Sequence, residues 1–202
     1  MYSPFGNLEL TPEENETAEF GFETHLLNRK IELITVVFYR NESNRFGFFT
    51  NPDTFASNYI NERPTFNAKG IEFSLKYSLF KNVTLQTNYT FTEVDATQAR
   101  LIAKHAVNAT LDYTLNSKFT LNVGFQFRDK RTDAYYDNST FATEEVNLAA
   151  YKLFSLSGRY TLLTNRLVLN AAVFNIANES FTETIGYNTR GRNVKLGLQV
   201  MF

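Results

Sequence analysis

The stretch FTLNVGFQFR, residues 119–128, alternates apolar and polar side chains without a break. Every second residue from Phe119 to Phe127 is apolar, and the intervening residues are threonine, asparagine, glycine and glutamine. A period of two residues is typical of a β-strand whose two faces meet different surroundings. This stretch therefore predicts a strand with one apolar face and one polar face.

The same alternation recurs along the chain, for example in IEFSLKYSL (71–79), VTLQTNYTFT (83–92) and NVKLGLQVMF (193–202). No segment of comparable length keeps the 3.6-residue period of a helix, so the sequence predicts an all-β protein. We expect nine strands, at 17–27, 30–42, 58–80, 83–95, 105–115, 118–130, 146–163, 166–178 and 192–202.

The predicted connections alternate strictly between very short and long. Short turns are expected near Asn28-Arg29, Lys81-Asn82, Asn116-Ser117 and Thr164-Asn165, and long loops at 43–57, 96–104, 131–145 and 179–191. Several of the strands exceed the roughly 9–11 residues that a tilted strand needs to cross a bilayer. Long strands with this rhythm of turns predict an antiparallel transmembrane β-barrel, with tight periplasmic turns and long external loops.

Composition excludes several other classes of protein. The chain has 20 Lys and Arg against 21 Asp and Glu, so no net positive charge favours nucleic acid. It contains no cysteine, which excludes disulfides, thiol nucleophiles and cysteine-based zinc sites. Aromatic residues make up 15% of the chain, yet mean hydropathy is −0.30. Apolar residues dispersed by alternation account for both values.

The side-chain chemistry of the two faces predicts their orientation. The polar sets are rich in threonine, asparagine, glutamine and serine, which suits a hydrated lumen. A charge that faced lipid at mid-bilayer would cost about 2–4 kcal/mol, which explains the absence of charges from the apolar set. We therefore expect Asn122, Gln126 and Arg128 to face the lumen. The residues expected to face lipid are Phe119, Leu121, Val123, Phe125 and Phe127.

The odd number of predicted strands indicates that the barrel is incomplete. The last predicted strand ends at the periplasmic side, so counting back through nine strands places the start of the chain in an external loop. A complete bacterial barrel has an even number of strands. We therefore expect a C-terminal fragment that lacks an odd number of upstream strands.

Four ordered motifs resemble those of TonB-dependent outer-membrane receptors and together span essentially the whole chain. The first is SPFGNLELTPEENETAEFGFE (3–23), and the second is NAKGIEFSLKY (67–77), with Gly70 and Glu72 in place. VFNIANESF (173–181) resembles an N-L-F-N-x-x-Y segment, although Ala177 and Phe181 replace the usual aromatics. RGRNVKLGLQVMF (190–202) resembles the closing strand, with Arg190 where proline is common.

The resemblance implies a barrel of 22 strands of which residues 1–202 form the C-terminal part, without the plug domain. It implies a receptor in the outer membrane of a Gram-negative bacterium that takes up a scarce nutrient such as a ferric siderophore or cobalamin. The implied partners are membrane lipid and lipopolysaccharide, a small-molecule ligand, TonB through the plug, and the barrel-assembly machinery. That machinery would recognise Phe202 as an assembly signal. The alternative is a passive porin.

Candidate ligand contacts lie in the long loops, where binding residues concentrate. The aromatic candidates are Phe48, Phe49, Tyr135 and Tyr136, which equally suit packing between loops. Arg190 and Arg192 flank Gly191 and suit either an anionic ligand or lipid phosphates.

The two histidines and the three loop aspartates predict no catalytic site and no metal site. His25 and His105 have no partner at a fixed spacing, so we expect loop or lumen histidines rather than catalysts, and no enzyme. Three loop aspartates, Asp129, Asp133 and Asp137, lack EF-hand spacing, and solvated residues are favoured over a calcium site. No cofactor and no metal site are expected.

Overall fold

The structure, a computed structural model, describes residues 5–63, 65–94, 100–164 and 166–201. In these residues the secondary structure is entirely β, and no helix is long and apolar enough to cross a membrane. The strands are β1 (Glu14–Leu26), β2 (Ile31–Ser43), β3 (Phe46–Thr50), β4 (Ser57–Asn61), β5 (Phe66–Phe80), β6 (Val83–Val94), β7 (His105–Asn116), β8 (Phe119–Arg128), β9 (Arg131–Asp137), β10 (Ala142–Leu148), β11 (Tyr151–Leu163), β12 (Leu167–Phe174) and β13 (Asn193–Val200).

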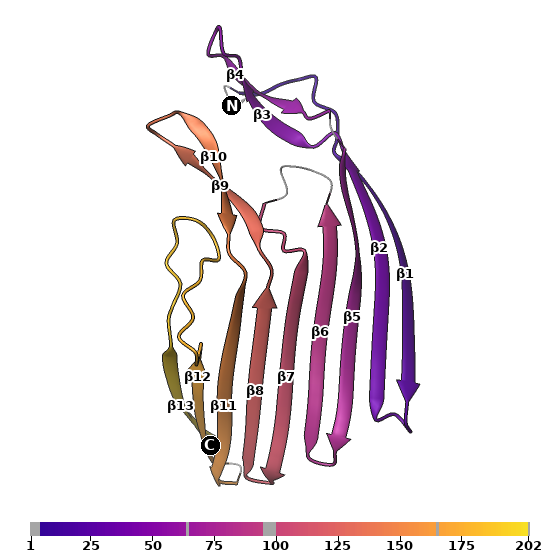
Figure 1. Cartoon of the computed structure of the whole chain (residues 1–202), viewed down its shortest axis with the longest axis vertical. Coiled ribbons are helices and arrows are strands. Elements are labelled where there is room, and N and C mark those ends of the chain that lie inside the picture. Colours follow the sequence, from indigo (N-terminus) through magenta and orange to yellow (C-terminus); the bar gives the residue numbers. More distant parts are fainter. Residues whose placement is uncertain (1–4, 64, 95–99, 165, 202) are drawn as a thin grey trace.

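Nine strands form one antiparallel sheet in the order β1-β2-β5-β6-β7-β8-β11-β12-β13 (Figure 1). The connections β1–β2, β5–β6, β7–β8 and β11–β12 are short and lie together at the lower rim in Figure 1. The longer connections lie at the opposite end. The predicted rhythm of short turns and long loops is thereby confirmed. The sheet is open in the described residues, because β1 and β13 form its two edges and do not pair with each other.

Three predicted strands were too long, and the one expected at 166–178 ends at Phe174 because Asn175 turns the chain. The strand expected at 58–80 begins in the sheet only at Phe66, because residues 57–61 form β4, which pairs with β3 in a separate hairpin. The strand expected at 146–163 begins at Tyr151, because residues 142–148 form β10, which pairs with β9. Both hairpins rise beyond the sheet as parts of the long loops (Figure 1). Only a few residues separate each hairpin from the strand that follows it, so the sequence does not show where the chain enters the main sheet.

The register of the sheet keeps the apolar residues of neighbouring strands on one face. Val123 of β8, for example, is directly opposite Leu111 of β7 and Leu156 of β11. The exposed fractions of these three side chains are 43%, 37% and 40%. Nothing in the described structure packs on this apolar face, which is the arrangement expected of a surface that lipid covers.

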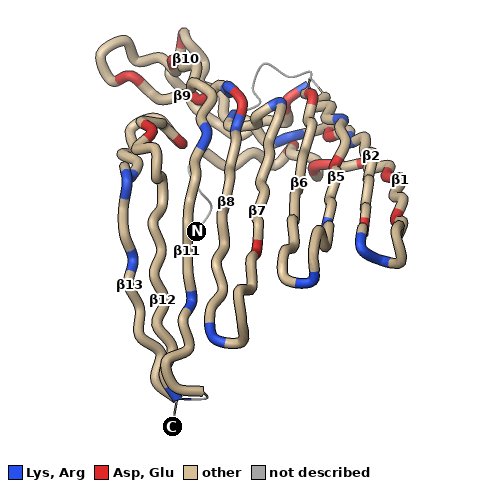
Figure 2. The backbone as a smooth tube through the Cα atoms, turned by 60° about the horizontal axis from the view of Figure 1, so that its bottom comes forward, with Lys and Arg blue, Asp and Glu red and all other residues tan. Residues whose placement is uncertain are grey.

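The other face, which we call the polar wall, is held together by side-chain hydrogen bonds across the strands. Asn122 Nδ2 donates to Asp112 Oδ1 at 2.8 Å, and Ser74 Oγ donates to Asn88 Oδ1 at 2.8 Å. The predicted lumen residues Asn122, Gln126 and Arg128 all lie on this wall, since they alternate with the apolar set of β8. Figure 2 shows charged residues mainly near the ends of the strands, with long uncharged stretches between them. This distribution suits a membrane-spanning sheet.

Candidate functional site

The connection between β12 and β13, residues 175–192, folds against the upper part of the polar wall. Asn175, directly after β12, is buried and has a φ of 50°. Its amide is bonded twice to the backbone of Glu179, accepting from the N–H at 2.8 Å and donating to the carbonyl at 2.9 Å. Asparagine tolerates this left-handed conformation better than most residues. Asn175 therefore turns the chain at the top of β12 and fixes the start of the loop.

The two ends of this loop are joined by a second asparagine. Asn178 Oδ1 accepts the backbone N–H of Arg192 at 2.8 Å, and the Arg192 Nε donates to the Ile176 carbonyl at 2.9 Å. A Cβ added at Gly191 would come within 2.7 Å of Asn178 Oδ1, so a larger residue there would displace the Asn178 amide. These contacts form a neck that holds the loop as a compact unit.

A cleft of about 790 Å³ lies between the loop and the polar wall. This volume falls within the range of roughly 300–1,000 Å³ that is usual for small-molecule sites. The wall contributes polar side chains such as Asn108, Thr110 and Gln126, and the loop contributes Glu183, Tyr187 and Arg190. The cleft thus offers amide, hydroxyl, carboxylate and guanidinium groups, together with the ring of Tyr187.

An aspartate from the β9–β10 hairpin holds the loop in place. Asp133 has no solvent exposure, and its Oδ2 accepts the backbone N–H of Ile185 at 2.9 Å. Its Oδ1 accepts from the Arg100 guanidinium, at 2.7 Å from Nη2 and 3.1 Å from Nε. These groups, which we call the Asp133 clasp, join three external connections. The Ile185 N–H and the Arg100 guanidinium stabilise the ionised form and hold the pKa of the Asp133 carboxyl below its usual value of 3.8, against the effect of burial.

A second set of contacts beside the clasp fixes the middle of the loop. Arg131 Nη2 donates to the carbonyls of Thr182 and Glu183 at 3.0 and 2.9 Å. The Arg131 guanidinium lies over the ring of Tyr151, 5.3 Å from its centroid, and Tyr151 in turn packs against Phe181 at 4.7 Å between centroids. The loop is therefore held at several points on the external side of the sheet.

Comparison with known proteins identifies the family to which this architecture belongs. A profile of the family described as "TonB dependent receptor-like, beta-barrel" matches residues 1–176. The chain belongs to this family. The family consists of Gram-negative outer-membrane proteins, so the apolar face is a membrane surface and the polar wall lines the lumen. The match favours a receptor over a porin, and the family is not a class of enzymes.

The chain matches only part of the length of each relative. The chain is 24% identical over 208 residues to the vitamin B12 transporter BtuB of Vibrio cholerae serotype O1, matching all of this chain and 32% of that transporter. The pyoverdine outer-membrane receptor FpvA of Pseudomonas aeruginosa PAO1 superimposes with a TM-score of 0.77 at 20% identity, over 96% of this chain and 30% of that chain. The FrpB iron transporter from Neisseria meningitidis gives 0.75 at 15% identity, over 94% and 31%. The structural matches show a shared fold, and the chain spans about a third of these proteins.

The structure separates the ligand candidates expected from the sequence. Arg190 lines the cleft, whereas the Arg192 guanidinium bonds to the backbone of the loop neck. The four aromatic candidates lie on the two external hairpins, Phe48 and Phe49 on β3 and Tyr135 and Tyr136 on β9, and they do not belong to the described lining of the cleft. All four are exposed, and ligand contact by them stays a prediction. Phe202, the predicted assembly signal, lies outside the described residues.

Two expectations about polar residues were wrong. Asp133 was expected to be a solvated loop residue, but it is fully buried because a guanidinium and backbone N–H groups replace water around it. His105 was expected in a loop or the lumen. It instead opens β7 on the apolar face, opposite Phe91, with Nδ1 2.9 Å from the Tyr89 hydroxyl. The three loop aspartates 129, 133 and 137 do not bring their carboxylates together as a metal-binding group in the described structure.

Arg190 and Gln126 were expected on this side from the sequence, but the residues that hold the loop in place were not. Asn175 and Asn178 carried a usable signal, because asparagine after a strand is a frequent turn residue. Asp133 and Ile185 carried no such signal, because their contact joins positions 52 residues apart.

Proposed function

We propose that this barrel belongs to an outer-membrane receptor for the TonB-dependent uptake of a scarce nutrient, such as a ferric siderophore or cobalamin. The observation that carries the proposal is the cleft between loop 175–192 and the polar wall, which is a preformed site on the lumen side of the sheet. Two kinds of relative support it, since similar proteins include a vitamin B12 transporter and a pyoverdine receptor.

Residues 1–202 supply part of this function. We propose that they form the C-terminal part of the barrel, and that a plug domain and its TonB contact lie elsewhere in the full-length gene product. Lipid, lipopolysaccharide, the barrel-assembly machinery and TonB are the partners that this role requires.

The cleft suggests how an anionic nutrient complex is held. Arg190 is exposed and lies in the lining, so its guanidinium is available for a carboxylate or a similar anionic group. The loop neck keeps the backbone beside it in place, since the Arg190 carbonyl accepts from Asn175 Nδ2 at 3.4 Å. Asn108 and Gln126 on the opposite side of the cleft add neutral hydrogen-bonding groups.

The test is nutrient-limited growth and radiolabelled uptake in a strain that lacks the gene and carries the full-length protein on a plasmid. A panel of ferric siderophores and cobalamin is supplied, with and without a functional TonB system. Uptake that requires both the gene and TonB supports the receptor. Diffusion of small solutes that continues at the same rate without TonB identifies the passive porin instead.

A pair of arginine variants tests whether the transported nutrient binds in the cleft. Arg190→Ala is expected to weaken binding of an anionic nutrient by about tenfold or more, because a hydrogen bond to a charged group contributes roughly 1.5–3 kcal/mol. Arg159→Gln is the matched control, because Arg159 is also a cation of the polar wall but lies outside the cleft lining. Equal binding by both variants and the wild type would remove Arg190 from the site.

A further inference from the structure

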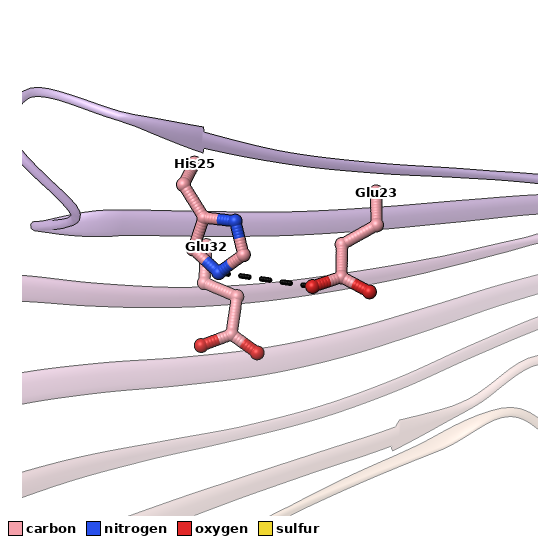
Figure 3. A group of neighbouring side chains, drawn as sticks. All are labelled: Glu23, His25 and Glu32. Carbon is pink, nitrogen blue, oxygen red and sulfur yellow. Dashed lines mark ion pairs between the residues drawn. The ribbon is translucent and has the colours of Figure 1, made fainter.

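Three side chains with metal-binding groups converge on the polar wall near the β1–β2 turn. Glu23 and His25 lie two residues apart on β1 and so share a face, and Glu32 of β2 is directly opposite His25 (Figure 3). One ligand atom from each residue lies within 4.8 Å of the other two. His25 Nε2 lies 3.7 Å from Glu23 Oε1.

We propose that Glu23, His25 and Glu32 form a binding site for a divalent first-row transition ion such as zinc. Zinc binds imidazole nitrogen and carboxylate oxygen at about 2.0–2.2 Å, which places two ligand atoms of a tetrahedral site roughly 3.4 Å apart. The observed 3.7 Å is close to that separation. Small rotations of exposed side chains complete the approach of the third ligand atom.

The backbone positions these three residues without help from the ion. All lie on paired strands, and the turn that follows is closed by a hydrogen bond from the Lys30 N–H to the Leu27 carbonyl at 3.2 Å. Sites built on strands hold their ligands more accurately than sites built on loops. The ion therefore needs only small side-chain rotations to complete its set of protein ligands.

The local charge also favours a cation. Two carboxylates flank a single imidazole, and Lys76 of β5 is the cation opposite Glu32 in the register. No ion pair joins Lys76 to Glu32 or Glu23 among the described residues. The side chains of His25 and Glu23 are 39% and 58% exposed, so an ion has access to them from the lumen side.

The mixture of ligand atoms selects the class of ion. Calcium and magnesium prefer shells made entirely of oxygen, whereas an imidazole together with carboxylates suits zinc and its neighbours. Three protein ligands leave a fourth position open to water or to another molecule. The site is built beside the β1–β2 turn, which lies at the lower rim in Figure 1, whereas the cleft is lined by the loop 175–192 at the opposite ends of β12 and β13. It is therefore independent of the proposed nutrient cleft.

The experiment measures zinc binding by the full-length gene product, purified in detergent and stripped with a chelator. Isothermal titration with Zn²⁺ is expected to show a site that Glu23→Gln, His25→Gln and Glu32→Gln each weaken by about tenfold or more, since even outer-shell partners contribute that much. Two variants serve as matched controls and should bind zinc normally. Glu19→Gln changes a carboxylate of β1 that lies on the same face but outside the cluster, and His105→Gln changes a histidine on the opposite face.

Competition tests the class of ion. A large excess of Ca²⁺ or Mg²⁺ should leave zinc bound, whereas displacement by an equal concentration of Ca²⁺ would assign an all-oxygen type of site and overturn the proposal. Absence of zinc binding, or zinc binding that His25→Gln leaves unchanged, would also overturn it. Heat-modifiable migration on a gel confirms that each variant has folded before it is titrated.

Discussion

The Asp133 carboxylate, which has no solvent exposure, accepts the backbone N–H of Ile185 at 2.9 Å, although the two residues are 52 positions apart. This hydrogen bond joins the β9–β10 hairpin to the loop that covers the cleft. Arg100 completes the Asp133 clasp from a third connection. The position of the cleft loop on the polar wall therefore depends on a residue that does not itself line the cleft.

Asp133→Asn is expected to release the loop. The variant loses the charge that pairs with Arg100 and weakens the bond to Ile185, and hydrogen bonds to charged groups contribute roughly 1.5–3 kcal/mol each. Amide hydrogen exchange in residues 180–190 should accelerate by about tenfold or more, as measured by mass spectrometry on the full-length protein.

The control for this variant is Asp137→Asn on the same hairpin. Asp137 Oδ1 bonds to the N–H and hydroxyl of Ser139, at 2.8 and 2.7 Å, and thus serves only the tip of the hairpin. Exchange in 180–190 should match the wild type. Equal protection of the loop in Asp133→Asn and Asp137→Asn would contradict the role of the Asp133 clasp.

The clasp is also expected to depend on pH. Because its partners hold the pKa of Asp133 below the usual 3.8, the ionised form stabilises the folded loop. This stabilisation is complete above about pH 4 and is lost as pH falls through the lower folded-state pKa. A spin label at Tyr187, which is 75% exposed, should become more mobile in that acidic range. Asp133→Asn should remove the transition, and a transition that survives in this variant would assign it to another group.

The two faces of β8 give a prediction that uses adjacent residues. Leu121 lies on the apolar face and Asn122 on the polar wall, where it bonds to Asp112. Residues 1–202 contain no cysteine, so Leu121→Cys and Asn122→Cys each add a single labelling site to this part of the barrel. In membranes, dissolved oxygen should relax the label at 121 several-fold more effectively, and a water-soluble nickel chelate should act on the label at 122. The reverse pattern would mean that the apolar face is turned inward.

Much of this fold was predictable because the alternation of a strand is a local property. The stretch 119–128 coincides with β8 along its whole length. The end of β10 was not separable from the start of β11, because only Ala149 and Ala150 lie between them and neither is a typical turn residue. Arg190 was predicted as a ligand contact, but the clasp and the shape of the cleft were not predictable, since they depend on contacts between segments that are distant in sequence. The Glu23, His25 and Glu32 group was missed because it requires the register of β1 against β2.

Gly70 gives a prediction about assembly of the sheet. A Cβ at this position would overlap the Phe91 carbonyl oxygen and the ring of Phe38, which lie on the two strands that flank β5. Forcing extra atoms into such a site costs about 1–3 kcal/mol, and here a strand backbone has to shift. Gly70→Ala should therefore lower the amount of folded protein in the outer membrane, as measured by heat-modifiable migration and surface protease resistance.

Gly197→Ala on β13 is the matched control for the same substitution in another strand. The nearest atom to a Cβ at Gly197 is Asn170 Cβ at 3.8 Å, an ordinary van der Waals separation, and φ at this position is not in the left-handed region. Replacing a strand glycine with alanine also lowers the backbone entropy of the unfolded chain, which favours folding slightly. Gly197→Ala should thus assemble at least as well as the wild type. If both alanine variants assembled normally, close packing around Gly70 would not be the reason for glycine there.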